Sequence, residues 1–301
     1  SNTTASNNTA VGYQAAYTNS TGTWNTALGY QSGYTSNNTG VTAIGYQALK
    51  VSVADYNTAV GVNAGVATTS GTVDAFGAGA LASNTTGAAN SAFSRDALNA
   101  NTTGSYNIAV GRSALQSNTT ASYNTAVGFR AGYNSVTGSD NVYVGAQAGY
   151  NASGTGNTFV GTSNNSGAGY HVTTGAKNTI LGGYNGNQNG LDIRTSSNNI
   201  VLSDGDGNPQ ARQQGVGGWY QTNNSASWSV VSDARIKKNV QTITNGLAII
   251  TALRPVEFDY ILKEKHDIGF IAQEYEQVLP DQISLDDTGS EEIKEIGRAH
   301  V

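Results

Sequence analysis

The segment SDARIKKN, residues 232–239, places side chains together that could perform acyl transfer. The hydroxyl of Ser232 is a weak nucleophile until a base removes its proton. The amine of Lys237, five residues further on, acts as such a base only if burial lowers its pKa toward neutrality. A Ser and a Lys at this spacing are ordinary surface residues in most sequences. The structural elements around the pair therefore decide its interpretation.

Carboxylates that could serve a glycosidase are scattered through the first 200 residues. A retaining glycosidase needs two carboxyl groups about 5 Å apart, whereas the Asp residues here occur singly, at Asp55, Asp74, Asp96, Asp140 and Asp192. Asp204, Asp206 and Asn208 imitate the start of a calcium loop, but Pro209 stands where such a loop needs Gly, and no Glu closes it. We interpret this segment as a turn and expect no metal and no cofactor.

An internal repeat dominates the chain before residue 204. Its five-residue core is NTAVG at residue 8, and variants such as NTALG and NTILG recur. The copies start at residues 25, 41, 57, 73, 90, 107, 124, 141, 157 and 178. The period of 16 or 17 residues, with a last step of 21, is too short for a helical hairpin. Because β-branched cores flanked by Asn, Gly and Thr are typical of short strands and tight turns, the repeat predicts a parallel β-solenoid (β-roll or β-helix) over residues 1–203.

Individual positions of the repeat carry further predictions. We expect the large apolar residue before the Gly, in a row from Val11 to Leu181, to fill the interior of each coil. The small residue three positions after the Gly should lie where a narrow coil leaves little room. The Gly marks a bend that a Cβ would obstruct. The Asn that opens most cores tolerates left-handed turn geometry, and its stacked amides can hydrogen-bond from coil to coil.

Tyrosines follow the Gly in the first three coils, at Tyr13, Tyr30 and Tyr46. They could form a solvent-facing or inter-coil ladder, pack between chains of a trimer, or stack on sugars. Solenoids with thin cores usually gain stability by association, so we expect a homotrimer. Over residues 8 to about 203 the repeats resemble the β-roll heads of trimeric autotransporter adhesins, although those repeats are usually shorter.

Charge and composition exclude several classes of partner. The net charge is −5 and no basic run occurs, which argues against nucleic acid. No apolar run approaches the roughly 18 residues that span a bilayer, so we expect no membrane insertion. The chain has no Cys, which excludes disulfides and Cys-ligated zinc. It also has no Met, so we expect it to be the interior of a longer protein.

The last 70 residues have a different composition. Of the 15 basic and 20 acidic residues in the chain, 21 lie at or after residue 232, which predicts a boundary near 231 and a neck or linker over 204–231. ITNGLAIITAL has helical spacing and ends before Pro255, PVEFDYIL alternates like a strand, and GFIAQEYEQVLP indicates a short helix. We therefore expect a small α+β domain over 232–294.

Three blocks in this domain, SDARIKKNV, LRPVEFDY and IGFIAQEYEQVLP, resemble the self-cleaving intramolecular chaperone of endosialidase tailspikes and other phage tail fibres. The resemblance covers residue 232 to about 285, with Ile236 and Val240 as mild departures. It implies a domain that trimerises at the end of a β-structured fibre, sets the register of the chains and then cuts itself off. By this resemblance Ser232 is the nucleophile, Lys237 is its base, and the bond between Val231 and Ser232 is cleaved.

Other polar residues near the pair receive lesser roles. Asp233 and Arg235 belong to the motif and could orient or pair charges, whereas we interpret Lys238 as a solvated charge and His266 as a surface residue. The final stretch EIGRAHV, residues 295–301, is what a string resembling a sequencing-library adapter would encode. We interpret it as adapter-derived, which leaves the chaperone domain incomplete and predicts poor cleavage in this form.

The leading functional hypothesis is a phage tail fibre or tailspike segment, located in the virion outside the cell and used for host attachment. Its partners would be two further copies of itself and a glycan or protein of the host surface. Its only enzymatic activity would be a single-turnover serine endopeptidase reaction without an external substrate. The alternatives are a trimeric adhesin on a bacterial cell surface and a glycan depolymerase whose catalytic domain lies upstream of residue 1.

Overall fold

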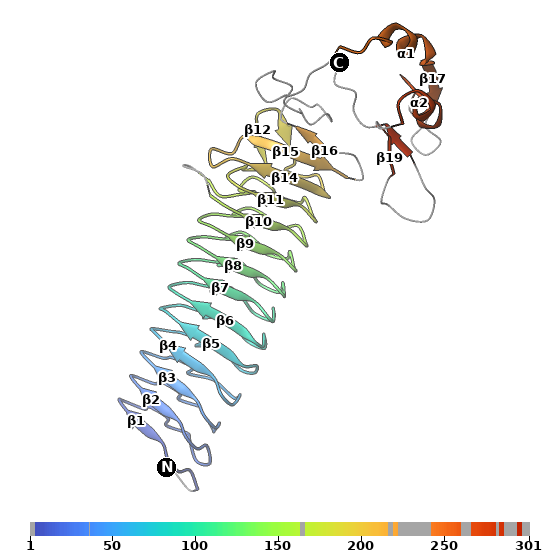
Figure 1. Cartoon of the computed structure of the whole chain (residues 1–301). Coiled ribbons are helices and arrows are strands. Elements are labelled where there is room, and N and C mark those ends of the chain that lie inside the picture. Colours follow the sequence, from blue (N-terminus) through green and yellow to red (C-terminus); the bar gives the residue numbers. More distant parts are fainter. Residues whose placement is uncertain are drawn as a thin grey trace. The chain divides into compact units, whose positions relative to one another are not determined.

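The computed structural model describes residues 4–35, 37–162, 166–215, 219–221, 242–259, 266–280, 283–285 and 294–296. The chain divides into two compact units, Ser1–Ser227 and Trp228–Val301. The first contains the repeats and the second contains the charged region, and each is described by itself below (Figure 1).

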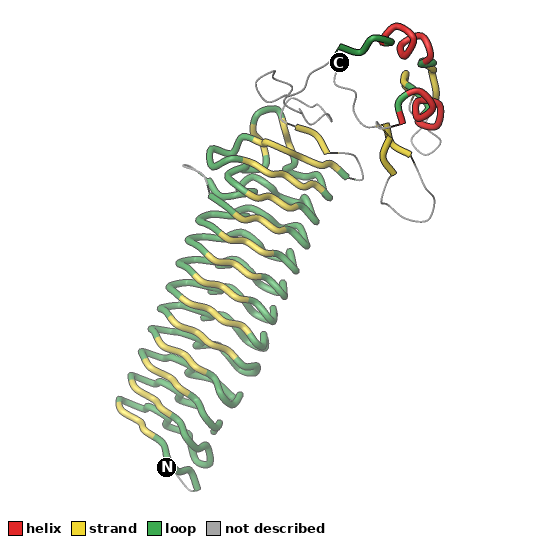
Figure 2. The backbone as a smooth tube through the Cα atoms, viewed as in Figure 1, coloured by secondary structure: helices red, strands yellow, loops and turns green. Residues whose placement is uncertain are grey.

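The first unit is a parallel β-solenoid with one short strand in each repeat. Its strands are β1 (Thr9–Val11), β2 (Thr26–Leu28), β3 (Thr42–Ile44), β4 (Thr58–Val60), β5 (Val73–Phe76), β6 (Asn90–Phe93), β7 (Ile108–Val110), β8 (Thr125–Val127), β9 (Val142–Val144), β10 (Thr158–Val160) and β11 (Thr179–Leu181). Each strand pairs in parallel with the next, so that Ala10 lies opposite Ala27 and Ala27 opposite Ala43. The strands form one continuous sheet along the shaft, and loops complete each coil (Figure 2). The predicted solenoid is therefore confirmed.

The sheet continues beyond the last repeat core. Strand β14 (Asn199–Ser203) is parallel to β11, and β15 (Pro209–Gln214) and β16 (Trp219–Gln221) follow in antiparallel pairing. Between β14 and β15 the carboxylate of Asp204 accepts hydrogen bonds from the side-chain amide (3.0 Å) and the backbone N–H (2.8 Å) of Asn208. These bonds, the amide first, lower the pKa of Asp204. The segment is a turn held by its own side chain, as the sequence predicts.

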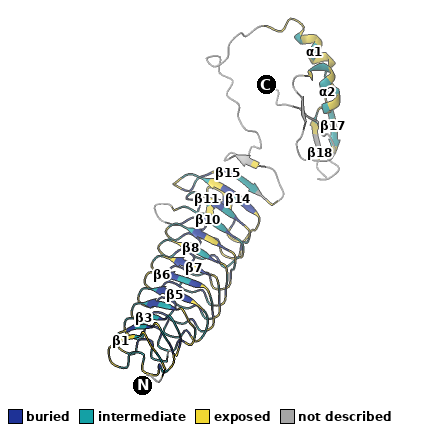
Figure 3. Cartoon of the chain, turned by 60° about the horizontal axis from the view of Figure 1, so that its bottom comes forward, coloured by how far each residue is buried: buried dark blue, intermediate teal, exposed yellow. Residues whose placement is uncertain are grey.

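The prediction that the row from Val11 to Leu181 fills the interior is wrong. The middle residue of each strand points inward instead, and Ala43, Ala59 and Ala75 are completely buried. Val11 and Leu28, at the ends of their strands, are 56% and 47% exposed. Because side chains alternate along a strand, an inward Ala leaves its two strand neighbours facing out. In Figure 3 the strands of the shaft carry buried as well as more exposed residues.

The interior is filled instead by the residues three and four positions after the Gly, where the coil turns a corner. The small residue three positions after the Gly is buried, as expected, in the coils that contain Ser32, Ala48, Ala64, Ala80, Ala97, Ala114, Ala131 and Ala148. In four coils the next residue is a completely buried leucine: Leu49, Leu81, Leu98 and Leu115. Where the middle strand residue is large, as at Tyr143, this position is Gly149, on which a Cβ would lie 2.3 Å from the tyrosine ring. In these coils a large residue at one of the two positions goes with a small residue at the other.

Two ladders of asparagine run through the solenoid. In the first, the backbone N–H of the residue that opens a core donates to the side-chain oxygen of the Asn that opens the core one coil earlier, as from Asn107 to Asn90 (2.9 Å) and from Asn124 to Asn107 (3.0 Å). This confirms the predicted bonding from coil to coil. The left-handed conformation lies one residue earlier than expected, for example at Tyr123 (φ 61°). The hydrogen bonds of the first ladder require the Asn side chain to face inward. Because residues two positions apart in a strand face the same side, the Ala two residues later faces inward as well.

The second ladder was not predicted. It joins Asn84, Asn101 and Asn118, which are completely buried in successive coils. The side-chain N–H of Asn101 donates to the Asn84 oxygen at 2.8 Å, and that of Asn118 donates to the Asn101 oxygen at 2.7 Å. A buried amide is costly unless it is hydrogen-bonded. The repeating bond gives each of these buried amides a partner in the neighbouring coil. The recurring NTT at these positions is the sequence signal for it.

The tyrosines after the Gly form a stacked ladder. The ring centroids of Tyr13 and Tyr30 lie 5.3 Å apart, as do those of Tyr30 and Tyr46, with planes within 16° and 10°. Tyr30 therefore has a ring on each face and exposes its edges. Stacking of a sugar on Tyr30 would require one of these ring pairs to separate. The geometry favours the inter-coil ladder among the three interpretations.

One strained residue in the Gly column provides a stability test. Ser94 occupies the position that is Gly in the other ten cores and has a φ of 115°, a conformation that side chains with a Cβ rarely adopt. We expect Ser94→Gly to raise the free energy of unfolding by about 1 kcal/mol, because it relieves backbone strain. Thermal unfolding followed by circular dichroism measures the change. Ser94→Ala keeps the Cβ and should not stabilise; an equal gain in both variants would contradict the explanation.

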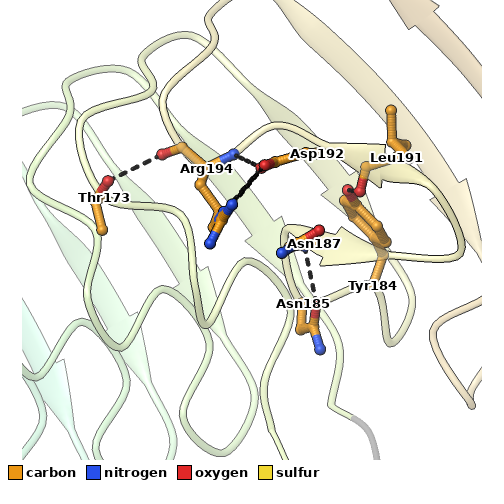
Figure 4. A network of polar contacts seen from close by, with 7 residues as sticks. All are labelled: Thr173, Tyr184, Asn185, Asn187, Leu191, Asp192 and Arg194. Carbon is orange, nitrogen blue, oxygen red and sulfur yellow. Dashed lines mark hydrogen bonds and ion pairs between the residues drawn. The ribbon is translucent and has the colours of Figure 1, made fainter.

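The coil that follows the last repeat core, between β11 and β14, contains an added hairpin. Strands β12 (Asn187–Gln188) and β13 (Leu191–Asp192) form it, and the hydroxyl of the buried Tyr184 donates to the Leu191 carbonyl at 2.7 Å. Figure 4 shows this contact beside the ion pair of Asp192 and Arg194, whose shortest N–O distance is 2.7 Å. The hydrogen bonds from Arg194 hold the pKa of Asp192 at about 2. The hairpin therefore makes its contacts within its own coil, and β11 still pairs with β14.

The second unit contains two short helices and two small sheets, which confirms the α+β prediction. The helices are α1 (Gly246–Ala252) and α2 (Ala272–Val278). Strands β17 (Val256–Asp259) and β18 (His266–Gly269) pair antiparallel, as do β19 (Ile283–Leu285) and β20 (Lys294–Ile296). Pro255 follows α1, and α2 ends before Pro280, in keeping with the restriction that Pro places on the preceding residue. None of the helices in the described part of the chain has the length and apolar character of a membrane span.

Candidate functional site

The residues predicted to perform self-cleavage, Val231, Ser232 and Lys237, lie outside the described residues. Asp233, Arg235 and Lys238 lie outside them too. What the structure describes is the set of elements that follow the pair, from α1 to α2. These elements carry the second and third blocks of the resemblance.

An ion pair joins these two blocks. Arg254, just after α1, donates through Nε to Oε2 of Glu274 in the first turn of α2, at 2.9 Å. The hydrogen bond from Arg254 lowers the pKa of Glu274. Both side chains are partly exposed, at 64% and 42%, so solvent weakens the pair. Its contribution is to position the end of α1 against the start of α2.

The hairpin between the helices carries the histidine of this region. His266 in β18 lies opposite Asp259 in β17, with Nδ1 3.0 Å from the Asp259 Oδ1 atom. The side chains are 62% and 78% exposed. This exposure confirms the interpretation of His266 as a surface residue.

The two helices differ in how they bury their apolar residues. In α2, Tyr275 is 4% exposed and its ring meets the Phe270 ring edge-on, with centroids 5.7 Å apart. By contrast, α1 buries none of its residues in the single chain, and Leu247 and Ile250 are 77% and 69% exposed. The apolar spacing that predicts this helix therefore describes a face that the described part of the chain does not cover.

The carboxylates of the shaft serve local contacts. Asp55 accepts the backbone N–H of Thr39 in the preceding coil at 2.8 Å, and Asp96 pairs with its neighbour Arg95 at 3.0 Å. Across the described residues, three or more His, Asp or Glu side chains do not gather in a way that could hold a metal ion. The contacts of Asp55 and Asp96 therefore stabilise the coils.

The sequence prediction did not anticipate the contact between Arg254 and Glu274. The two residues are 20 positions apart, and both lie inside blocks that carry the family resemblance. Their position inside those blocks was the available signal. The structure brings the two blocks together through this pair, while it leaves the first block undescribed.

Comparison with known proteins identifies a family for this region. Residues 232–284 match the family model described as chaperone of endosialidase. The search of curated proteins and the search of solved structures found no match. The matched region begins at Ser232 and includes α1, β17, β18 and α2, so a β-solenoid is followed in the sequence by a region similar to the chaperone of endosialidase.

Proposed function

We propose that this chain is part of a phage tail fibre or tailspike, in which a β-solenoid shaft is assembled by a C-terminal intramolecular chaperone that then cuts itself off. The observation that carries the proposal is the order of the two parts. The match to the chaperone of endosialidase begins at Ser232, after a solenoid whose sheet extends to β16. A fibre followed by its chaperone is the arrangement that the resemblance implies.

The proposed cleavage uses Ser232 as the nucleophile on the carbonyl carbon that precedes it. The hydroxyl attacks the Val231 carbonyl while the neutral amine of Lys237 accepts its proton. The bond from that carbon to the Ser232 nitrogen breaks, and Lys237 returns the proton to the departing nitrogen. Water then hydrolyses the ester, which leaves a carboxylate on Val231 and a free amine on Ser232. The reaction occurs once in each chain and consumes one water molecule.

The proposal includes assembly into a homotrimer, which the two units support separately. The shaft has a thin interior made largely of Ala, and α1 leaves Leu247 and Ile250 exposed. A thin core usually gains stability by association, and the exposed side chains of α1 are apolar surface that association would cover. We expect sedimentation equilibrium of the protein, expressed from its complete gene, to give the mass of three chains. A stable monomer across the micromolar range would contradict the assembly.

The attachment role and the location outside the cell follow from the fibre assignment. Labelled shaft, purified after cleavage, would be tested for binding to a panel of bacterial strains. We expect binding to a subset of strains, with loss when surface glycans or surface proteins are removed. A shaft that binds no strain that its phage infects would count against host attachment while leaving the chaperone function intact.

A further inference from the structure

We infer that the outer face of the solenoid sheet is the surface along which copies of this shaft pack, side by side, parallel and in register. This inference rests on the proposed function, which requires several copies, and it assigns the surface that joins them. We define the outer sheet face by the outward residues of strands β1 to β11 and β14. It has two rows of outward residues, one on each side of the inward row, and its apolar row consists of Val11, Leu28, Ile44, Val60, Phe76, Phe93, Val110, Val127, Val144, Val160, Leu181 and Leu202.

One of the two outward rows of this face is apolar along its whole length and is partly open to solvent in the single chain, whereas the other row is mostly Thr, as at Thr26, Thr125 and Thr158. Phe93 is 41% exposed and Leu181 is 44% exposed, and the valines between them are half-buried or exposed. Asp74 is the one charged residue among the outward residues of these strands. Soluble proteins rarely leave an apolar stripe of this length uncovered, so a partner surface is required.

The folding of the coil does not explain this row. The interior is completed by the inward Ala residues, by the corner leucines such as Leu81 and Leu98, and by the buried asparagines. Polar residues on the outside would have served an isolated coil equally well. The large apolar residue at the end of nearly every strand therefore serves a contact outside the coil.

The size of the outer sheet face fits association between protein chains. Strands lie about 4.8 Å apart and rise about 3.3 Å per residue, so twelve strands of three residues cover a flat area of roughly 500 Å². Projecting side chains make the accessible area larger than the flat area. A stable interface needs about 800 Å² from each partner, which the outer sheet face with its flanking residues approaches.

A second copy of the same shaft matches the spacing of this row. The row presents one apolar side chain in each coil, and only a partner with the same coil spacing can meet every member along the shaft. Parallel copies in register place each residue at the height of its own equivalent. The rings of Phe76 and Phe93, stacked with centroids 5.0 Å apart, would then meet the same pair in the neighbouring copy.

Another face of the coil is already occupied by its own ladders. The Gln47 amide donates to the Gln31 oxygen at 3.0 Å, and that of Gln31 donates to Gln14 at 2.8 Å. The tyrosine rings beside them stack on one another. These groups are hydrogen-bonded or ring-stacked within their own chain. On the outer sheet face Phe76 and Phe93 also stack on each other, whereas aliphatic side chains can make neither kind of contact.

Single-cysteine crosslinking tests the assignment, because the chain has no native Cys. Val127 and Val136 belong to the same coil and are equally exposed, at 38% and 40%, but only Val127 lies on the outer sheet face. In the full-length protein, we expect Val127→Cys to form covalent multimers with oxidant or a short bismaleimide, and Val136→Cys to remain a single chain. Crosslinking at Val136→Cys without crosslinking at Val127→Cys would overturn the inference.

Charge substitution provides a second, independent measurement. Val110→Glu combined with Val127→Glu should weaken association more than tenfold, because carboxylates buried in an apolar interface are costly. Val136→Glu should leave it unchanged, and circular dichroism checks that each variant folds. A trimer that tolerates the double variant and lacks the Val127→Cys crosslink would refute this face while the proposed function stands. A monomeric wild type would refute both.

Discussion

Ser232→Ala is expected to abolish cleavage of the chain. The wild-type protein, expressed from its complete gene, should yield a shaft that ends at Val231 and a released piece that begins at Ser232. The substitution removes the oxygen that attacks the Val231 carbonyl, and no neighbouring group in the proposed reaction replaces it. Intact-mass spectrometry distinguishes one long chain from two fragments. A cut between residues 231 and 232 that persists in Ser232→Ala would exclude Ser232 as the nucleophile.

The base is tested with three lysine variants. Lys237→Ala should stop cleavage by leaving the Ser232 hydroxyl protonated, and Lys237→Arg should not rescue it, since a guanidinium stays charged and cannot accept the proton. Lys238→Ala serves as the matched control, because the adjacent lysine is interpreted as a solvated charge, and this variant should cleave at the wild-type rate. Equal loss of cleavage in the Lys237→Ala and Lys238→Ala variants would point to a general effect of charge.

Assembly should survive the loss of cleavage. In the order of events that the resemblance implies, the chaperone acts before the peptidase, so uncut Ser232→Ala should sediment with the same number of chains as the wild type. A monomeric Ser232→Ala variant would mean that cutting is needed for assembly. That result would reverse the proposed order while leaving the nucleophile in place.

The coil repeat was predictable because it depends on local pattern. Each NTAVG-like core supplies a short β-branched strand, and the Gly that follows supplies the bend, so period and strand position could both be predicted from sequence. The helices of the second unit were predictable for the same reason, since apolar spacing and the two prolines delimit α1 and α2. Strands, turns and helices that depend on residues close in sequence can therefore be predicted from the sequence.

The direction in which the strand faces was not predictable from the size of the residues. Alternation allows either Val127 or Ala126 to face inward, and the larger residue is the ordinary choice for a core. The Asn124 side chain decides it, because its oxygen must accept the backbone N–H of Asn141 in the next coil at 3.0 Å. That bond joins residues 17 positions apart and exists only in the stacked structure.

The candidate site shows the same division. Ser232 and Lys237 were identified from a motif, and their chemistry depends on a distance and a degree of burial that sequence does not contain. The pairing of Arg254 with Glu274 likewise depends on how α1 and α2 come together. The motif identifies the Ser232 hydroxyl and the Lys237 amine as the reacting groups, but only the folded chain determines their distance and burial.

The stacking of the coils should depend strongly on the glycine column. Gly128 has a φ of 139°, and a Cβ there would lie 2.4 Å from the Gly145 carbonyl oxygen in the next coil. Gly128→Ala therefore combines a strained backbone with a clash against main chain, which cannot move without displacing the next strand. We expect a loss of about 3 kcal/mol or more in the free energy of unfolding. Thermal and denaturant unfolding of the shaft measure it.

Two other glycines separate the causes of that loss. Gly190 has a φ of 77°, but a Cβ there would meet nothing within 4 Å, so Gly190→Ala should cost only the backbone strain, about 1 kcal/mol. Gly205 has neither a positive φ nor a close neighbour, and Gly205→Ala should be close to neutral. The excess loss in Gly128→Ala over Gly190→Ala then measures the close approach of successive coils. If the two variants lose the same stability, the coils do not approach each other closely at the glycine column, and the compact stacking of the shaft is refuted.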